Sequence, residues 1–255
     1  MKIKDTLENS VLAVPENLPL LAAETVRKWG KTLVVAPHPD DESLGCGGAI
    51  ALLRKFGCEV KVLVMTDGTL SHPNSKKYPA SALRDLRERE MLAALKVLGV
   101  AAEKTTFLRY TDRSLPNENS ENFSNAVGIC VKHLKKNVPQ TILLPWRRDP
   151  QPDHFAANQI IRTAKSRLSF PVKLFEYPIW LWELASGEDA PRTGEARAWR
   201  LDTKSVAAQK QAAIAAHESQ ITDLIDDDPQ GFRLTPEILA NFAAPWEIYL
   251  EALCE

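Results

Sequence analysis

The stretch KTLVVAPHPDDE, residues Lys31–Glu42, decides both the fold class and the place of a functional site. Its first half, Lys31–Ala36, is a short run rich in apolar, β-branched residues, which is typical of a buried strand. Its second half ends that strand with two prolines and places one imidazole and three carboxylates within five residues. A helix is expected to follow over Ser43–Phe56 and to end at Gly57.

The alternation of strand and helix continues well beyond this stretch. Further strands are expected at Glu59–Met65, Thr105–Tyr110, Thr141–Pro145 and Val172–Tyr177, with helices at Ser81–Leu98, Phe123–Lys136 and Asp153–Leu168. Strands that alternate with helices of this length imply βαβ units. The sequence therefore predicts a Rossmann-like α/β fold of three layers, with a mainly parallel sheet covered by helices on both faces.

The length of 255 residues suits a single α/β domain. We interpret residues 1–30 as an N-terminal extension, partly helical at Leu18–Lys28, and residues 31–220 as the core of the domain. Residues 221–255 are interpreted as a helical C-terminal tail that ends in an aromatic helix around Ala243–Leu253.

Composition excludes several classes of partner. The net charge is −1, from 32 basic and 33 acidic residues, and gives no electrostatic reason to expect nucleic acid or an anionic membrane. The sequence has no apolar run near the 18 or so residues of a membrane span and no signal-peptide pattern over residues 1–30. Four scattered cysteines favour reduced thiols over disulfides. We expect a cytoplasmic protein that acts on a small molecule, and we leave a homo-oligomer open.

The acidic residues of the opening stretch predict a metal site. Side by side at the end of a buried strand they would repel one another, and a divalent cation resolves that repulsion. His38 and Asp41 are ligand types that zinc accepts, and a catalytic zinc needs three protein ligands. His154 is the best candidate for the third, because it also follows a strand and so is expected at the same edge of the sheet. Asp40 is then free to act as general base on the metal-bound water.

Other residues near these loops allow more than one interpretation. Asp153 begins a predicted helix, where an aspartate is commonly no more than a cap. Arg147 and Arg148 precede it and are candidates to bind a phosphate or carboxylate of a substrate, since arginine engages such groups bidentately. The aromatic cluster Tyr177–Trp182 would suit the apolar face of a sugar, although a core or subunit contact explains it more simply.

With these motifs in view, the chain resembles the LmbE-like deacetylases, also called the PIG-L family, over about residues 31–220. Five elements carry the resemblance, and their order along the sequence makes them more specific together than any one alone. They are Ala36–Glu42 with Leu44–Gly48; Thr66–Gly68; Arg87 with Glu90, Ala94, Leu98 and Gly99; Pro152–His154; and Lys210 with Ala213, Ile214, His217, Ser219 and Gln220. The glycine-rich part alone resembles a dinucleotide-binding turn, but here it fits close packing of the first helix beside the metal loop.

The resemblance implies a zinc enzyme that removes the N-acetyl group from an N-acetylglucosamine conjugate. It implies His38, Asp41 and His154 as ligands of one Zn²⁺ per chain and Asp40 as general base, in agreement with the chemical argument. It also implies that Arg87 lies in or beside the substrate pocket. Fe²⁺ or Co²⁺ would accept the same ligands.

Gln151 departs from the family pattern, which usually has His-Pro-Asp-His at residues 151–154. In the family that first histidine is thought to stabilise the tetrahedral intermediate, and the aspartate, here Asp153, to tune its charge. Glutamine can donate a hydrogen bond but cannot supply a proton or a positive charge. We keep Asp153 as catalytic and Gln151 as substrate-binding. Arg147, Arg148 and His217 are candidates to take over the missing role.

These observations predict a zinc-dependent N-deacetylase that acts on an amino-sugar conjugate, whose aglycone the sequence does not identify. Two alternatives remain open at this point. One is a hydrolase of another amide or of an ester on the same metal site. The other is a Rossmann-like binding protein whose metal is only structural, an alternative that Gln151 favours. Metal analysis combined with an assay of acetate release distinguishes them, since a structural site is coordinatively closed.

Overall fold

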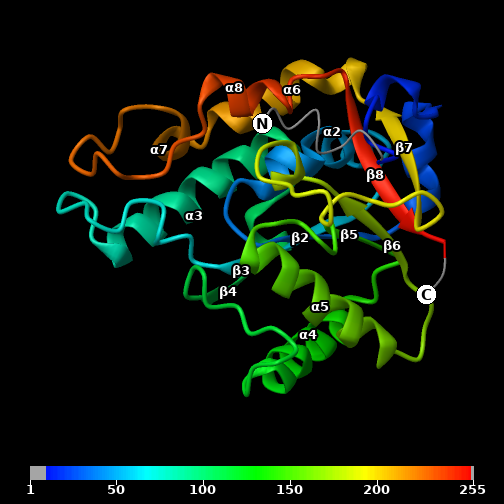
Figure 1. The fold of residues 1–255 in the computed structure, drawn as a ribbon, viewed down its shortest axis with the longest axis horizontal. Coiled ribbons are helices and arrows are strands. Elements are labelled where there is room, and N and C mark those ends of the chain that lie inside the picture. Colours follow the sequence, from blue (N-terminus) through cyan, green and yellow to red (C-terminus); the bar gives the residue numbers. More distant parts are fainter. Residues whose placement is uncertain (1–9, 254–255) are drawn as a thin grey trace.

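The computed structural model describes residues 10–253, which fold around one eight-stranded sheet (Figure 1). The strand order is β1-β7-β8-β6-β5-β2-β3-β4. The strands are β1 (Leu20–Leu21), β2 (Thr32–Ala36), β3 (Val60–Thr66), β4 (Thr105–Tyr110), β5 (Thr141–Pro145), β6 (Lys173–Tyr177), β7 (Ala196–Asp202) and β8 (Trp246–Ala252). All neighbouring pairs from β6 to β4 are parallel, whereas β8 runs antiparallel to both of its neighbours.

Helices cover both faces of the sheet, with α2, α3 and α6 above it and α4 and α5 below it in the view of Figure 1. The α-helices are α2 (Asp41–Lys55), α3 (Ala80–Val97), α4 (Phe123–Asn137), α5 (Pro152–Ser166), α6 (Ala207–Ala215), α7 (Glu218–Ile221) and α8 (Pro236–Ala240). Short 3-10 helices are η1 (Pro15–Asn17), η2 (Ala23–Trp29), η3 (Ala102–Lys104), η4 (Trp180–Trp182) and η5 (Lys204–Val206). None of the helices in residues 10–253 is long and apolar enough to cross a membrane.

The central strand β2 divides its side chains between two cores. Val34 and Ala36 pack into the cluster that contains α2, α3 and α6, while Leu33 and Val35 pack into the one that contains α4 and α5. Every residue of β2 is buried. This burial follows from a parallel sheet with both faces covered, in which alternate side chains enter opposite layers. The predicted fold class, a three-layer α/β domain with a mainly parallel sheet, is confirmed.

The predicted elements of the core are also confirmed, because each begins and ends within two residues of its expected bounds. The N- and C-terminal predictions are wrong. The segment expected as an aromatic helix around Ala243–Leu253 contains β8, which pairs with the whole of β7. The helix expected at Leu18–Lys28 is replaced by β1 and the 3-10 helix η2, and in the described part of 221–255 only α8 and the end of α7 are α-helical. A short apolar run such as Ile248–Leu250 does not distinguish strand from helix by its periodicity.

A buried carboxylate holds β8 against the first long helix. Glu247 accepts hydrogen bonds from the backbone N–H groups of Gly48 (2.6 Å) and Ala49 (2.8 Å) in α2, and it pairs with Lys210 of α6 at 2.9 Å. Both charged side chains are almost fully buried. Removal of either partner would leave an uncompensated buried charge. The C-terminal strand therefore belongs to the same packed unit as the helix that carries Asp41.

The glycines of α2 let that helix approach the sheet closely. A Cβ atom at Gly45 would lie 2.4 Å from Cδ2 of Tyr177, the aromatic residue whose hydroxyl donates to the carbonyl of Val35. At Gly48 it would lie 2.5 Å from Cγ2 of Thr203. Such distances require the neighbours to move, which explains the glycine-rich sequence as a packing requirement.

We expect Gly45→Ala to lower the free energy of unfolding by roughly 1–3 kcal/mol, because the added methyl group overpacks the contact with Tyr177. Urea denaturation measures the change. Gly128→Ala in α4 is the matched control, since nothing lies within 4 Å of its added Cβ. We expect it to stabilise the protein by about 0.5–1 kcal/mol, the gain of alanine over glycine inside a helix. Equal unfolding curves for Gly45→Ala and the unsubstituted protein would contradict the packing argument.

Candidate active site

Four loops meet at the carboxyl ends of the neighbouring parallel strands β5, β2, β3 and β4. In such sheets ligands bind outside these ends. Together with α3, the segment around η4 and the segment before and within α8, the loops enclose a cavity of about 410 Å³. Its lining residues are His38, Asp40, Asp41, Leu44, Leu70, Ser71, Arg87, Asp112, Arg113, Gln151, Trp180, Glu183, Leu184, Phe232, Leu234 and Ile238. The prediction that residues 37–42 and 146–154 share one edge of the sheet is confirmed.

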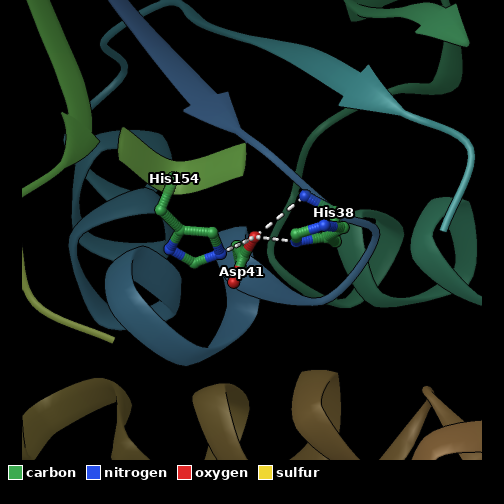
Figure 2. Close-up of side chains that lie close together, drawn as sticks. All are labelled: His38, Asp41 and His154. Carbon is green, nitrogen blue, oxygen red and sulfur yellow. Dashed lines mark hydrogen bonds and ion pairs between the residues drawn. The ribbon is translucent and has the colours of Figure 1, made fainter. Parts of the chain in front are cut away.

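His38, Asp41 and His154 converge on one another (Figure 2), and the first two line this cavity. Oδ2 of Asp41 lies 3.3 Å from Nδ1 of His38 and 3.1 Å from Nε2 of His154. The same oxygen accepts the backbone N–H of His38 at 2.8 Å. All three residues are buried, and their ligand atoms lie within 4.8 Å of one another. The donor set, two imidazole nitrogens and a carboxylate oxygen, is that of a three-ligand metal site.

Each imidazole has a carboxylate at its far nitrogen. Nε2 of His38 lies 3.1 Å from Asp153 Oδ2 and 3.3 Å from Asp112 Oδ1. Nδ1 of His154 lies 3.4 Å from Asp149 Oδ1. A carboxylate in this position keeps a proton on the far nitrogen and turns the lone pair of the near nitrogen towards a metal. Asp112 and Asp149 were not singled out in the sequence, although both follow predicted strands at the same edge of the sheet.

His154 fits a metal better than it fits its protein neighbours. Both ring nitrogens are buried, yet within residues 10–253 neither makes a hydrogen bond of acceptable geometry. Buried polar groups are rarely left in this state. A cation placed between its Nε2 atom and the carboxylate of Asp41 would satisfy both groups. The residues present therefore fit the divalent ion that the sequence predicts.

The carboxylates of the cluster also favour positive charge on the two imidazoles. Burial opposes a charge on His38, but Asp112 and Asp153 at its Nε2 atom, together with Asp41, outweigh burial and raise its pKa well above the ordinary value. Burial likewise opposes a charge on His154, and Asp41 with Asp149 raises its pKa to about 9. Protons therefore fill the role of a cation in the metal-free cluster, and a metal must displace them to bind.

Asp40 faces the cavity from a strained backbone. Its φ of 137° is in a region that residues other than glycine rarely adopt, a conformation that costs on the order of 1–3 kcal/mol. Its carboxylate accepts a hydrogen bond from Nη2 of Arg87 at 3.0 Å. Burial, opposed mainly by Arg87, raises the pKa of Asp40 to about 6. A carboxylate with such a pKa can both accept and return a proton near neutral pH.

Three side chains hold this backbone in place. Glu42 accepts the backbone N–H of Asp40 through Oε2 at 3.1 Å. The other oxygen of Glu42 lies 3.2 Å from Nε2 of His217, which is 1% exposed. Arg87 donates to the carbonyls of Pro39 (2.6 Å) and Gly68 (2.7 Å) as well as to the carboxylate. Arg87 thus lines the cavity as expected, whereas His217, expected to bind substrate, lies behind Glu42 and outside the lining.

Gln151 caps the helix that carries the third candidate ligand. Its Oε1 accepts the backbone N–H groups of Asp153 (2.5 Å) and His154 (3.1 Å) at the start of α5. Asp153 is therefore not the cap. Its carboxylate instead accepts N–H groups from Arg113 and Leu115 of the loop after β4. Nε2 of Gln151 lies in the cavity lining, 3.3 Å from Nε2 of His38.

Arg147 and Arg148 were expected to bind substrate, and the structure places both outside the cavity lining. The guanidinium of Arg147 pairs with the buried carboxylate of Glu176, and that of Arg148 pairs with Glu195. Both guanidinium groups also lie over the ring of Trp146. These partners direct the two side chains away from the metal cluster, although the backbone of the loop follows β5 as predicted.

The chain is similar in sequence and in fold to known deacetylases. Residues 33–165 match the family model "PIG-L: GlcNAc-PI de-N-acetylase". A probable N-acetyl-α-D-glucosaminyl L-malate deacetylase 2 of Bacillus subtilis is 27% identical over 225 residues, covering 82% of this chain and 92% of that protein. The diacetylchitobiose deacetylase of Thermococcus kodakarensis is 32% identical over 128 residues, covering 49% of this chain and 45% of that protein. The structure of N,N'-diacetylchitobiose deacetylase from Pyrococcus horikoshii shares the fold, with a TM-score of 0.61 at 22% identity, over 93% of this chain and 84% of that one.

The raised pKa of His154 predicts how the metal-free protein responds to pH. Because the folded pKa, about 9, is higher than the ordinary 6.5, the stabilisation is complete below pH 6.5 and is lost as the pH rises through 9. In chelator-treated protein we expect a loss on the order of 1–3 kcal/mol between these values.

Urea denaturation at several pH values measures this loss. His154→Gln should reduce this loss, and His38, whose pKa is also raised, accounts for the remainder. His133→Gln, on α4 outside the site, should leave the loss above pH 7 unchanged, because burial lowers the pKa of His133 and confines its contribution to lower pH. A divalent metal should restore stability most strongly at high pH, where it no longer competes with the proton. The same pH dependence in His154→Gln and the unsubstituted protein would show that His154 does not carry it.

Proposed function

This chain belongs to the PIG-L family, and from that premise we propose that it hydrolyses the acetamide of an N-acetylglucosamine conjugate to acetate and the free amine. The relatives reported above are named as deacetylases of such conjugates. The observation that carries the proposal is the convergence of two imidazoles and one carboxylate beside a second carboxylate in a cavity. Three ligands and an adjacent base are the arrangement that metal-assisted amide hydrolysis needs.

We propose that His38, Asp41 and His154 hold the metal, and that the ion is zinc. Two imidazole nitrogens and one carboxylate oxygen are a common catalytic zinc set, and Fe²⁺ is the runner-up because it accepts the same ligands. Bound there, the ion would polarise the acetyl carbonyl and lower the pKa of a water molecule. Asp153 and Asp149 would hold the two imidazoles in the ligating tautomer.

Asp40 is the proposed general base. It removes a proton from the attacking water as the C–O bond to the acetyl carbon forms. The protonated carboxyl then delivers that proton to the leaving nitrogen as the C–N bond breaks. Arg87 orients the carboxylate throughout, and Glu42 with His217 fixes the backbone that carries it. One residue can perform both transfers because its pKa, about 6, lies near neutral pH.

Gln151 stands where the family usually has a histidine, and its position allows it to perform part of that histidine's role. The far nitrogen of His38 is engaged by Asp153, so the amide hydrogens of Gln151 remain available to a ligand in the cavity. They can donate to the carbonyl oxygen as negative charge develops on it. They cannot deliver a proton, which leaves proton delivery to Asp40.

The second candidate function is hydrolysis of another amide or of an ester on the same site. Gln151 is the observation that favours it, because loss of the imidazole changes how the site stabilises an oxyanion. A panel of N-acetylglucosaminides, N-acetyl amino acids and acetyl esters distinguishes the two functions.

Three described cysteines, Cys46, Cys58 and Cys130, are free. Free thiols are usual in reducing compartments, and we propose that the enzyme works in the cytoplasm.

Asp40→Asn should lower acetate release by a factor of about 10² to 10⁴, the usual contribution of a general base. Metal content should stay at that of the unsubstituted protein, because Asp40 is not a proposed ligand. Acetate assays and elemental analysis measure the two quantities. Asp85→Asn, a more exposed aspartate on α3, is the control and should leave both unchanged. Near-full activity of Asp40→Asn would overturn the assignment of the base.

His217→Gln should lower kcat about tenfold with little change in KM or metal content, because it loosens Glu42 and so the backbone of Asp40. Combined with Asp40→Asn it should cause no further loss, since residues that act as a unit are not additive. Steady-state kinetics on the single and double variants measure this. If the two losses multiply instead, His217 acts independently of Asp40.

A further inference from the structure

The cavity has an apolar part that the proposed hydrolysis does not use. We call it the apolar wall and define it by Trp180, Leu184, Phe232, Leu234 and Ile238, all of which line the cavity. Leu184 is 59% exposed, an unusual state for a large apolar side chain within a cavity. The rings of Trp180 and Phe232 meet edge to face with centroids 5.6 Å apart. Leu234 is buried and the remaining three residues are half-buried, so the wall is an apolar side of the cavity rather than an open patch. Apolar side chains that line a cavity beside a catalytic cluster are typical of a region that binds part of a substrate.

The part of the wall that includes Phe232 is held in place by contacts within the protein. The backbone N–H of Phe232 donates to the carbonyl of Ser71 at 2.6 Å. Asp227 accepts the hydroxyl of Ser75 (2.7 Å) and the backbone N–H groups of Lys76 and Lys77 (2.8 and 2.9 Å). These contacts join the loop after β3 to the segment that leads into α8. A preformed surface binds without the entropy cost of ordering its own loops.

The charges around the wall disfavour an anionic group. Glu183 is the ionisable residue that lies next to the wall in sequence and lines the cavity with it. Among the lining residues of the described chain, the basic side chains are His38, Arg87 and Arg113, and His38 belongs to the proposed metal site. Arg87 is buried and committed to Asp40 and two carbonyls, which leaves Arg113 as the exposed cation. A carboxylate-bearing aglycone would therefore meet few cations and several acids.

We propose that the substrate is an N-acetylglucosaminide with an uncharged, apolar aglycone, alkyl or aryl, which lies on the apolar wall while the acetamide faces Asp40. This inference rests on the proposed function. It separates the chain from its Bacillus subtilis relative, whose name specifies an L-malate conjugate and therefore an anionic aglycone. The wall contributes affinity through buried apolar area, and burial of about two methylene groups is enough for a factor of about ten.

The test compares the hexyl, methyl and L-malate glycosides of N-acetylglucosamine on the full-length, zinc-loaded protein. Both kcat/KM for acetate release and affinity by titration calorimetry are measured. We expect the hexyl glycoside to exceed the other two at least tenfold in each quantity. Leu184→Ser should reduce the hexyl-to-methyl ratio severalfold. Leu20→Ser is the matched control, because Leu20 is similarly exposed at 51% but does not line the cavity, and its ratio should be unchanged.

Three results would overturn the inference: equal constants for the hexyl and methyl glycosides, a preference for the malate glycoside, or a ratio that Leu184→Ser does not change. If no glycoside releases acetate, the proposed function fails and calorimetry alone decides the inference. Tighter binding of the hexyl glycoside that Leu184→Ser abolishes would still support the wall as its binding surface. Equal affinities would exclude the wall as a binding surface.

Discussion

The carboxylate of Asp41, placed between two buried imidazoles, is the interaction on which the rest of the site depends. It lies in the first turn of α2, where the end of a parallel strand and the start of a helix meet. The surrounding acids at the far nitrogens would be costly to bury without positive charge. A divalent ion, or protons in its place, therefore holds together loops that follow strands distant in sequence. Binding of the cation and organisation of the site are in this sense one event.

The strained backbone of Asp40 is the second constraint. Asp41 turns its carboxylate towards the imidazoles, whereas Asp40, with a positive φ, turns its own towards Arg87. The cost of its positive φ is offset by Glu42 beneath it and by Arg87, which binds the carbonyl before it and its own carboxylate. Adjacent aspartates thus perform different tasks because their backbone conformations differ, although their chemistry is the same.

Different segments of the chain form the part of the cavity where hydrolysis is proposed and the part where the aglycone is proposed to bind. The acids and imidazoles come from loops at the ends of the central strands, which the sheet holds rigidly. The apolar wall comes from η4, from Leu184 just after it, and from the segment before and within α8, which the Asp227 contacts join to the loop after β3. Such a division lets aglycone preference change among relatives without disturbance of the catalytic cluster.

The sequence by itself determined the alternating core, the shared edge of the sheet and the convergence of His38, Asp41 and His154, because strand order and local motifs suffice for each. Tertiary structure alone decided the rest. Ile248–Leu250 became a strand because β7 offered it an unpaired edge, and Arg147 and Arg148 turned from the cavity because Glu176 and Glu195 lay elsewhere. His217 lies behind Glu42 because its Nε2 atom pairs with that carboxylate. Side-chain direction depends on partners distant in the chain, and spacing within a motif carries no information about them.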